Sequence, residues 1–244
     1  MIKINNLTKK YKDKLAVDNL NLEIKTGELF SLLGTNGAGK TTTIKMLSTL
    51  ILPTSGEVEI NNLDLVKDSS KIKEIINISP QETAVASNLT VLENLYFMAG
   101  IYQIPNKEDK IKELIKLFKL EEVLKQKAKT LSGGYQRKLS IAISLINNPK
   151  ILFLDEPTLG LDVISRHDLW KVIEALKGKT TIILTTHYME EAEVLSDRIG
   201  IMNKGKLIEL GTSKELIKKA KTKNFEDAFI KIIEEDNNEN TNIC

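Results

Sequence analysis

The chain has 244 residues, of which 41% are hydrophobic and 28% charged. This composition is typical of a globular protein with a sizeable core, and it excludes collagen-like, mucin-like and wholly disordered chains. Its 35 Lys and Arg residues against 33 Asp and Glu residues leave a net charge of only +2. We therefore expect no nucleic-acid partner, because proteins that neutralise many phosphates carry a clear basic excess.

The cysteine and hydropathy patterns indicate a cytoplasmic protein. The single cysteine is Cys244, so the sequence offers neither a disulfide pair nor a cysteine cluster for zinc. No segment approaches the roughly 18 consecutive apolar residues of a membrane-spanning helix, and the first residues lack the apolar stretch of a signal peptide. If the protein works at a membrane, we expect another polypeptide to supply the membrane part.

The first 60 residues are predicted to form strands, since short apolar stretches alternate with polar residues and turns. One continuous apolar run, residues 28–33, has the length of a buried strand and ends at Gly34. After a glycine-rich segment, a helix is expected over residues 41–50, because helices tend to end ahead of a proline such as Pro53. The other predicted strands of this part lie at residues 2–4, 20–24 and 58–60.

A helical insert is expected at residues 85–139, where apolar residues recur at helical spacing. Thr90 and Glu93 fit a capping box that opens its first helix. Strand signals return at residues 151–154 and 180–186 with a helical segment between them, and this alternation predicts a parallel sheet.

The organisation that follows is a single domain, residues 1–220, and a C-terminal extension, residues 221–244. The domain consists of a core, residues 1–84 and 140–220, with the helical insert 85–139 between its two parts. Within the extension, the polar and acidic tail Glu234–Asn240 is expected to be disordered.

Residues 34–41 fit the phosphate-loop pattern G-x-x-x-x-G-K-[ST], with a buried strand before the pattern and a helix after it. Glycines let the backbone wrap tightly around phosphate, and the helix N-terminus adds partial positive charge. We expect Lys40 to contact the β- and γ-phosphates of ATP, and Thr41 to offer its hydroxyl to Mg²⁺. The loop as a whole is predicted to bind nucleotide: Gly34, Thr35, Asn36, Gly37, Ala38, Gly39, Lys40, Thr41 and Thr42.

Three predicted strands end in chemically useful residues: one runs into the phosphate loop, one into Asp155 and Glu156, and one into His187. Ligands of open parallel sheets bind at the carboxyl ends of the strands, so all three ends should lie along one edge. Asp155 is suited to hold Mg²⁺, and Glu156 could act as general base on the attacking water. His187 is a candidate contact for the γ-phosphate, although a lone histidine at a strand end is more often structural or solvated.

Leu131-Ser132-Gly133-Gly134-Tyr135-Gln136 is a second glycine-rich turn at a predicted helix N-terminus, and it lacks a lysine. With the phosphate loop and Asp155-Glu156, it resembles the signature of the ATP-binding cassette (ABC) superfamily, specifically its transporter nucleotide-binding subunits. The resemblance covers roughly residues 1–215. It implies an α/β fold: a P-loop NTPase core with a parallel sheet, an N-terminal antiparallel β subdomain and an inserted α-helical subdomain. It also implies an ATPase with ATP and Mg²⁺ as cofactors.

The family resemblance assigns further roles residue by residue. Subunits of the family pair head to tail, so Ser132, Gly133 and Gly134 of one subunit would close over ATP bound by the other. Tyr135 departs from the family, which most often has glutamine there, so its role stays open. The remaining matches are Gln81 as a link between Mg²⁺, water and the insert, Asp162 as a contact to the opposite subunit, His187 as the switch histidine and Tyr11 as the aromatic on adenine.

Segments after His187 resemble cassettes of drug-resistance-type exporters that are encoded apart from their permease, as does Phe225–Phe229. The resemblance thus implies an ATPase that powers export through a separate integral membrane permease. It would dimerise with itself or a sister ABC ATPase and lie peripherally on the cytoplasmic face of the membrane. Neither the substrate nor the choice between homodimer and heterodimer can be read from the chain.

Two alternatives come from other classes. The first is a cytosolic ABC ATPase that moves no solute, of which an iron–sulfur assembly partner is the form hardest to exclude. The second is a simple P-loop kinase or GTPase, which leaves Leu131–Tyr135 unexplained. The predicted packing residues Trp170 and Met189, and the surface residue His167, enter none of these sites.

Overall fold

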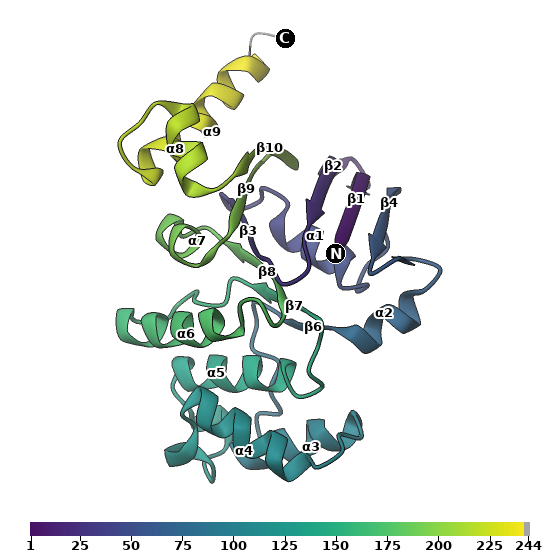
Figure 1. Cartoon of the computed structure of the whole chain (residues 1–244), viewed down its shortest axis with the longest axis vertical. Helices are drawn as coiled ribbons and strands as arrows, with labels where there is room; N and C mark the ends of the chain where they lie inside the picture. Colours follow the sequence, from purple (N-terminus) through teal and green to yellow (C-terminus); the bar gives the residue numbers. More distant parts are fainter. Residues whose placement is uncertain (242–244) are drawn as a thin grey trace.

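The computed structural model describes residues 1–241, and its strands form two sheets (Figure 1). The smaller sheet is antiparallel and contains the N-terminal strands, which pack their alternate apolar residues against the core. It therefore matches the N-terminal antiparallel β subdomain expected from the sequence. Its strand order is β2 (Lys14–Ile24), β1 (Ile2–Tyr11), β4 (Ser55–Ile60) and β5 (Leu63–Asp64).

The larger sheet is parallel except for one antiparallel edge strand, β10. Its central strands are buried along their whole length, which explains why they appear in the sequence as continuous apolar runs. The strand order is β10 (Lys206–Gly211), β9 (Arg198–Asn203), β3 (Leu29–Gly34), β8 (Thr181–Thr186), β7 (Ile151–Asp155) and β6 (Ile76–Ser79).

Neighbouring parallel strands β3, β8 and β7 end together. Leu33 of β3 pairs with Thr186 of β8, and Thr185 pairs with Asp155 of β7. The carboxyl ends of the three strands consequently meet at one edge, as the sequence predicts.

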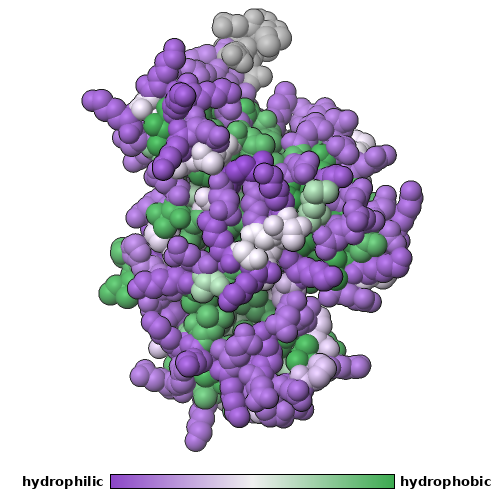
Figure 2. All heavy atoms as spheres, viewed as in Figure 1, coloured by the Kyte–Doolittle hydropathy of each residue, from purple (hydrophilic) through white to green (hydrophobic). Residues whose placement is uncertain are grey.

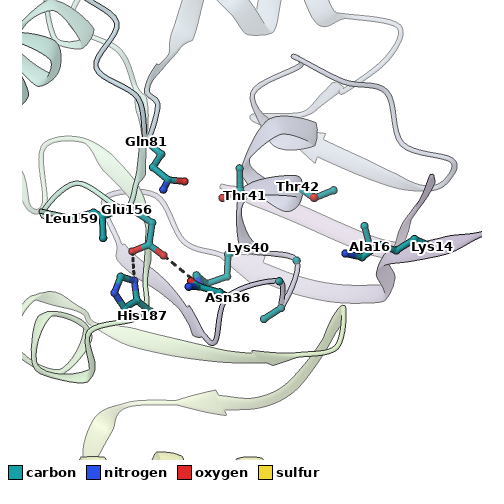
Figure 3. Close-up of a pocket in the computed structure, with 13 residues that line it drawn as sticks. Lys14, Ala16, Asn36, Lys40, Thr41, Thr42, Gln81, Glu156, Leu159 and His187 are labelled. Atoms are coloured by element: carbon teal, nitrogen blue, oxygen red, sulfur yellow. Dashed lines mark hydrogen bonds and ion pairs between the residues drawn. The ribbon is translucent and has the colours of Figure 1, made fainter. Parts of the chain in front are cut away.

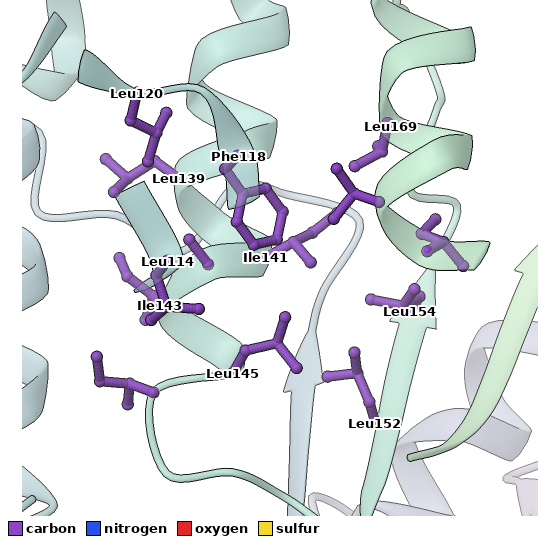
Figure 4. Packing of buried hydrophobic residues seen from close by; sticks show 14 of the residues in the cluster. Leu114, Phe118, Leu120, Leu139, Ile141, Ile143, Leu145, Leu152, Leu154 and Leu169 are labelled. Carbon is purple, nitrogen blue, oxygen red and sulfur yellow. The ribbon is translucent and has the colours of Figure 1, made fainter. Parts of the chain in front are cut away.

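The insert consists of α3 (Val91–Ile101), α4 (Lys107–Phe118), two short 3₁₀ turns (Glu121–Val123 and Ala128–Thr130) and the first half of α5 (Gly133–Ser144). The capping box at its start is confirmed: the Thr90 hydroxyl accepts from the Glu93 amide, and the Glu93 carboxylate accepts from the Thr90 amide. Helix α5 crosses the expected boundary at residue 139. Its apolar residues join those of α4, β7 and α6 (Val163–Leu176) in one hydrophobic cluster (Figure 4), so insert and core pack as one body.

The remaining helices cover the sheets and the far end of the molecule. Helix α1 (Lys40–Leu47) ends earlier than predicted, because Thr49 takes a left-handed conformation with φ 61° and the Leu50 amide bonds back to the Lys45 carbonyl. Figure 1 shows α8 and α9 at the end opposite the insert. The other bounds are α2 (Ser69–Ile75), α7 (Met189–Leu195), α8 (Ser213–Ala220) and α9 (Phe225–Thr241).

The tail Glu234–Asn240 was expected to be disordered, but it is part of helix α9, which extends to Thr241. Phe225, Phe229 and Ile232 bury one face of the helix against α8 and β9, and this anchors the polar turns that follow. Further along the helix, the Asn203 side-chain amide donates to Asp236 Oδ2 at 2.7 Å. Residues 242–244 of the expected C-terminal extension lie outside the described residues.

No helix among residues 1–241 has the length and apolar character needed to cross a bilayer. Most of the face in Figure 2 is hydrophilic, and the hydrophobic areas on it are small and separate.

Candidate nucleotide-binding site

The phosphate loop connects β3 to α1, and two of its glycines are required by the backbone. A Cβ on Gly34 would lie 2.4 Å from the Met202 carbonyl oxygen. Gly39 has φ +105°, and a Cβ there would lie 2.5 Å from the Ala16 carbonyl oxygen. No side chain caps the start of α1, so its first amides are available to an anion.

A pocket of about 420 Å³ opens at this loop, within the range of small-molecule sites (Figure 3). Loop residues 36–42 line it together with Gln81, Glu156 and His187. The structure therefore brings together side chains that are far apart in the chain, as their positions at strand ends predict.

The Lys40 ammonium lies at the centre of the loop and is buried. It donates to the carbonyl oxygens of Gly34 at 2.7 Å and Thr35 at 3.2 Å, and its Nζ lies 3.3 Å from Glu156 Oε1. These contacts hold a positive charge between the loop and Glu156. The charge is suited to the β- and γ-phosphate oxygens of ATP.

Asp155 and Thr41 meet next to this lysine. The Thr41 hydroxyl donates to Asp155 Oδ1 at 3.0 Å, and the Thr185 hydroxyl donates to the same oxygen at 2.6 Å. Gln81 lines the same pocket. A hydroxyl, a carboxylate and an amide are the hard oxygen donors that Mg²⁺ prefers.

The protein donors for Mg²⁺ are few. Within residues 1–241 no group of three or more His, Cys, Asp and Glu side chains could hold a metal by itself. Such a sparse set fits Mg²⁺, which keeps several waters and takes its other ligands from substrate phosphates. The donors present thus fit Mg²⁺ bound with a nucleotide, rather than a metal caged by protein alone.

Glu156 follows the last residue of β7, and its carboxylate makes contacts separate from those of Asp155. Its Oε2 lies 2.8 Å from His187 Nδ1, while its Oε1 faces Lys40. Glu156 has φ 48°, in the left-handed region that non-glycine residues rarely adopt. This conformation turns the carboxylate toward the pocket, where it is almost fully buried.

The glycine-rich turn Ser132–Gly134 is not among the residues that line this pocket. Ser132 is exposed and caps α5 by accepting from the Tyr135 amide. A Cβ on Gly133 would meet no atom within 4 Å, whereas one on Gly134 would lie 2.9 Å from Ser165 Oγ. The turn therefore presents Gly133 to open space, beside the start of α6.

Asp162 and Tyr11 are likewise not among the residues that line the pocket. Asp162 is exposed and caps α6, accepting from the Ser165 amide at 3.0 Å. Tyr11 is 46% exposed at the end of β1, and the Lys9 ammonium lies over its ring. Tyr11 pairs across the β1–β2 hairpin with Lys14, which lines the pocket together with Ala16, so a contact of Tyr11 with adenine stays a prediction.

Sequence reasoning missed Arg137, which joins three parts of the site. Its guanidinium is buried and donates to the carbonyl oxygens of Asp155 and Pro157 at 2.7 Å, of Pro80 at 2.5 Å and of Gln81 at 3.3 Å. Burial lowers the pKa of Arg137 to about 10, against the opposing effect of nearby carboxylates. The local sequence gave no clear signal of its burial, because Ser140 and Ser144 share the helix face of Arg137 with Ile141.

Comparisons with known proteins agree with this geometry. Residues 17–159 match the ABC transporter family. The linearmycin resistance ATP-binding protein LnrL of Bacillus subtilis is 40% identical over 88% of this chain and 70% of its own length. The probable multidrug ABC transporter ATP-binding protein YbhF of Escherichia coli is 39% identical over 99% of this chain, which spans only 43% of YbhF.

Solved structures share the fold as well. A dimeric ATP-binding cassette in a post-hydrolysis state, bound to ADP and Pi, has a TM-score of 0.79 and 30% identity over 87% of this chain and 98% of its own. CbiO1 of Clostridium perfringens, part of the ABC transporter complex cbiONQ, has a TM-score of 0.80 and 28% identity over 89% of this chain and 90% of its own. The chain belongs to the ABC transporter family, among the ATP-binding subunits.

Proposed function

We propose that this protein binds and hydrolyses ATP to power export of a substrate through a separate membrane permease. One observation carries the ATPase part: Lys40, Thr41, Glu156 and His187 line a single pocket at the carboxyl edge of the parallel sheet, and Asp155 accepts from the Thr41 hydroxyl beside it. A purely structural protein has no need for this convergence of a cation, two carboxylates and an imidazole.

In the proposed reaction, Lys40 and the first amides of α1 bind the phosphates of ATP. Thr41, Asp155 and Gln81 would hold Mg²⁺, which neutralises phosphate charge when bound. The Thr185 hydroxyl fixes the Asp155 carboxylate from the side of the sheet. These residues therefore bind and orient the nucleotide rather than take part in proton transfer.

Glu156 is the proposed general base and takes the proton of the attacking water. His187 lies against its Oε2 and holds the carboxylate in place at the strand end. The Lys40 ammonium lies 3.3 Å from the other carboxylate oxygen and holds it on the side of the phosphate loop.

We infer that two such subunits share each ATP. Ser132, Gly133 and Asp162 are exposed, and neither they nor the half-buried Gly134 line the pocket of their own chain, so a second cassette is the natural place for their contacts. Gly133 faces open space and its turn begins a helix, both of which suit close approach to phosphate. The dimeric cassette with bound ADP and Pi supports this arrangement.

The helical insert is the proposed docking surface for the permease, which would place the protein on the cytoplasmic face of the membrane. Helix α3 exposes Tyr96, Phe97 and Ile101, apolar side chains that a membrane protein could cover. The resistance and multidrug names of LnrL and YbhF support export as the direction.

The test is a pair of measurements on Glu156→Gln. The variant should bind ATP, accumulate as an ATP-bound dimer, and hydrolyse ATP at least about 10²-fold more slowly, as expected for loss of a general base. Glu190→Gln, which changes an exposed glutamate of α7, is the control for the loss of charge. Full turnover in Glu156→Gln would remove Glu156 from its proposed role.

The second measurement identifies the partner. Tagged Glu156→Gln is purified with ATP from detergent-solubilised cells of the source organism, and the proteins that come with it are identified. A polytopic membrane protein at comparable yield supports the transporter function and names the permease. Recovery of soluble partners alone would favour a cytosolic ABC ATPase, such as an iron–sulfur assembly partner.

A further inference from the structure

Glu191 is a fully buried carboxyl that the proposed reaction does not use. It lies on α7, four residues after His187, and its exposed fraction is 0%. Glu190 and Glu193 on the same helix are exposed, so α7 turns only one of its three glutamates inward. An acidic group without solvent is costly, and it persists in a core only where surrounding groups hold it.

The partner that holds Glu191 belongs to a different helix. Trp170 of α6 donates its indole N–H to Glu191 Oε1 at 3.0 Å, and both side chains are buried. Helix α6 begins at its N-cap Asp162, the residue expected to contact a second subunit. The bond thus ties the helix that follows Asp162 to the helix that follows His187.

The second oxygen of Glu191, Oε2, concerns the loop between β7 and α6, which contains Thr158 near its start and Asp162 at its end. Among the described residues, this Oε2 is buried without a hydrogen-bond partner, and so is the hydroxyl of Thr158, two residues after Glu156. The Thr158 and Thr186 hydroxyls lie close enough to the carboxyl to oppose the rise of its pKa, but burial dominates and raises the pKa of Glu191. A protonated carboxyl would give its second oxygen a proton to donate toward Thr158.

Charged groups of the site also face this carboxyl. The Glu156 carboxylate acts to raise the pKa of Glu191, and Glu191 acts to raise that of Arg137 on α5. A further contact supports the same link between helices, because the Arg166 guanidinium of α6 lies 4.6 Å from the ring centroid of Tyr188, next to His187.

We infer that Glu191 is a positioning residue for the proposed hydrolysis: it holds the His187 segment against Trp170 and Thr158, and so couples His187 to the loop that contains Asp162. This inference rests on the proposed ATPase function. Its consequence is that a displacement of Asp162 at a subunit contact reaches His187, and through it Glu156, by way of two packed helices.

The test compares ATP turnover in the assembled transporter with ATP affinity. Glu191→Ala should lower kcat about tenfold or more, roughly 1.4 kcal/mol of barrier, while the Kd for ATP stays within about twofold. Glu191→Gln, which can accept from Trp170 and donate toward Thr158, should restore most of the rate. Glu190→Ala and Glu193→Ala are matched controls on exposed positions of the same helix.

A double-mutant cycle separates positioning from general stabilisation. Trp170→Phe removes the indole N–H, so it should lower kcat by itself but cause no further loss in the Glu191→Ala background. Trp170 is the single tryptophan of the chain, so one indole N–H signal in ¹⁵N NMR reports the bond directly. That signal should move upfield in Glu191→Ala and keep its position in Glu190→Ala.

The outcomes are distinguishable. If the wild-type transporter hydrolyses ATP and folded Glu191→Ala does so at the same rate, the inference is wrong but the proposed function stands. The same conclusion follows if Glu191→Gln is as slow as Glu191→Ala. If Glu191→Ala does not fold, kcat and the Kd for ATP are compared in Glu191→Gln and Trp170→Phe instead. The inference then requires that Glu191→Gln keeps most of the wild-type kcat and that Trp170→Phe lowers it. A wild-type transporter that does not hydrolyse ATP overturns the proposed function, and the inference falls with it.

Discussion

Glu156 and His187 are joined by a 2.8 Å contact between Oε2 and Nδ1, although 31 positions separate them in the chain. The same carboxylate reaches Lys40 with its other oxygen. One acidic side chain thus links the phosphate loop to the end of β8. Its neighbour Asp155 makes a separate set of contacts with Thr41 and Thr185, so two adjacent carboxylates have different surroundings.

His187→Ala should lower kcat by about 10²-fold or more, within the range assigned to general acid–base machinery. The physical reason is that Glu156 loses the side chain that holds its Oε2. ATP binding should persist, because His187 is not part of the phosphate loop. Steady-state hydrolysis and equilibrium ATP binding on the same preparation check this, and a parallel loss of affinity would contradict it.

Asp155→Asn should weaken ATP binding in the presence of Mg²⁺ more than in EDTA. The amide keeps the shape of the side chain but replaces the anionic oxygen that suits Mg²⁺. The measurement is the ratio of the two dissociation constants for ATP, compared with that of the wild type. An equal effect with and without Mg²⁺ would place Asp155 outside the metal site.

Ser132→Arg should abolish hydrolysis while each monomer still binds ATP, since the turn lies outside the pocket of its own chain. Because Ser132 also caps α5, its loss costs about 1 kcal/mol of stability, and a second variant is needed. Gly133→Val places its side chain where the structure leaves open space, so the fold should be kept. Light scattering with ATP, in the Glu156→Gln background, should detect no dimer for either variant. Unchanged ATP hydrolysis by the single variants, with Glu156 intact, would refute the shared site.

Arg137→Lys should destabilise the fold by about 2–4 kcal/mol, the cost of leaving one or two buried carbonyl groups without a donor. A lysine ammonium cannot reach the carbonyl oxygens of Asp155, Pro157 and Pro80 in the fork geometry that the guanidinium provides. Urea unfolding measures the change. Lys138→Arg, on the partly exposed neighbouring position, should lie within about 0.5 kcal/mol of wild type.

Glu191→Gln should gain stability over wild type as pH rises above 4.5, the ordinary pKa of a glutamate. Burial raises the pKa of Glu191 in the folded chain, so the folded state holds the proton more tightly than the unfolded state does. Wild type therefore loses stability from pH 4.5 up to the folded pKa, and the glutamine does not. Urea unfolding at several pH values from 4.5 upward tests this, and a constant difference would contradict it.

Much of the site was predictable because its residues follow local rules. The phosphate loop needs glycines at Gly34 and Gly39 for backbone reasons, and strand-end placement led to Asp155, Glu156 and His187. The capping box at Thr90 was equally local. Tyr11 was assigned by resemblance alone and stays a prediction: it does not line the pocket itself, but it pairs with Lys14, which does.

The sequence by itself determined the parallel core, the inserted helices and the residues at the sheet edge, because hydrophobic periodicity and backbone constraints act over a few neighbouring residues. Only the tertiary structure decided that Arg137 joins three backbone segments, that Glu191 is buried against Trp170, and that helix α9 extends to Thr241. Each of these features depends on the packing of elements that are distant in the chain. The local sequence around a buried charged residue, or of a polar helix held by a distant strand, does not distinguish it from a residue or helix exposed to solvent.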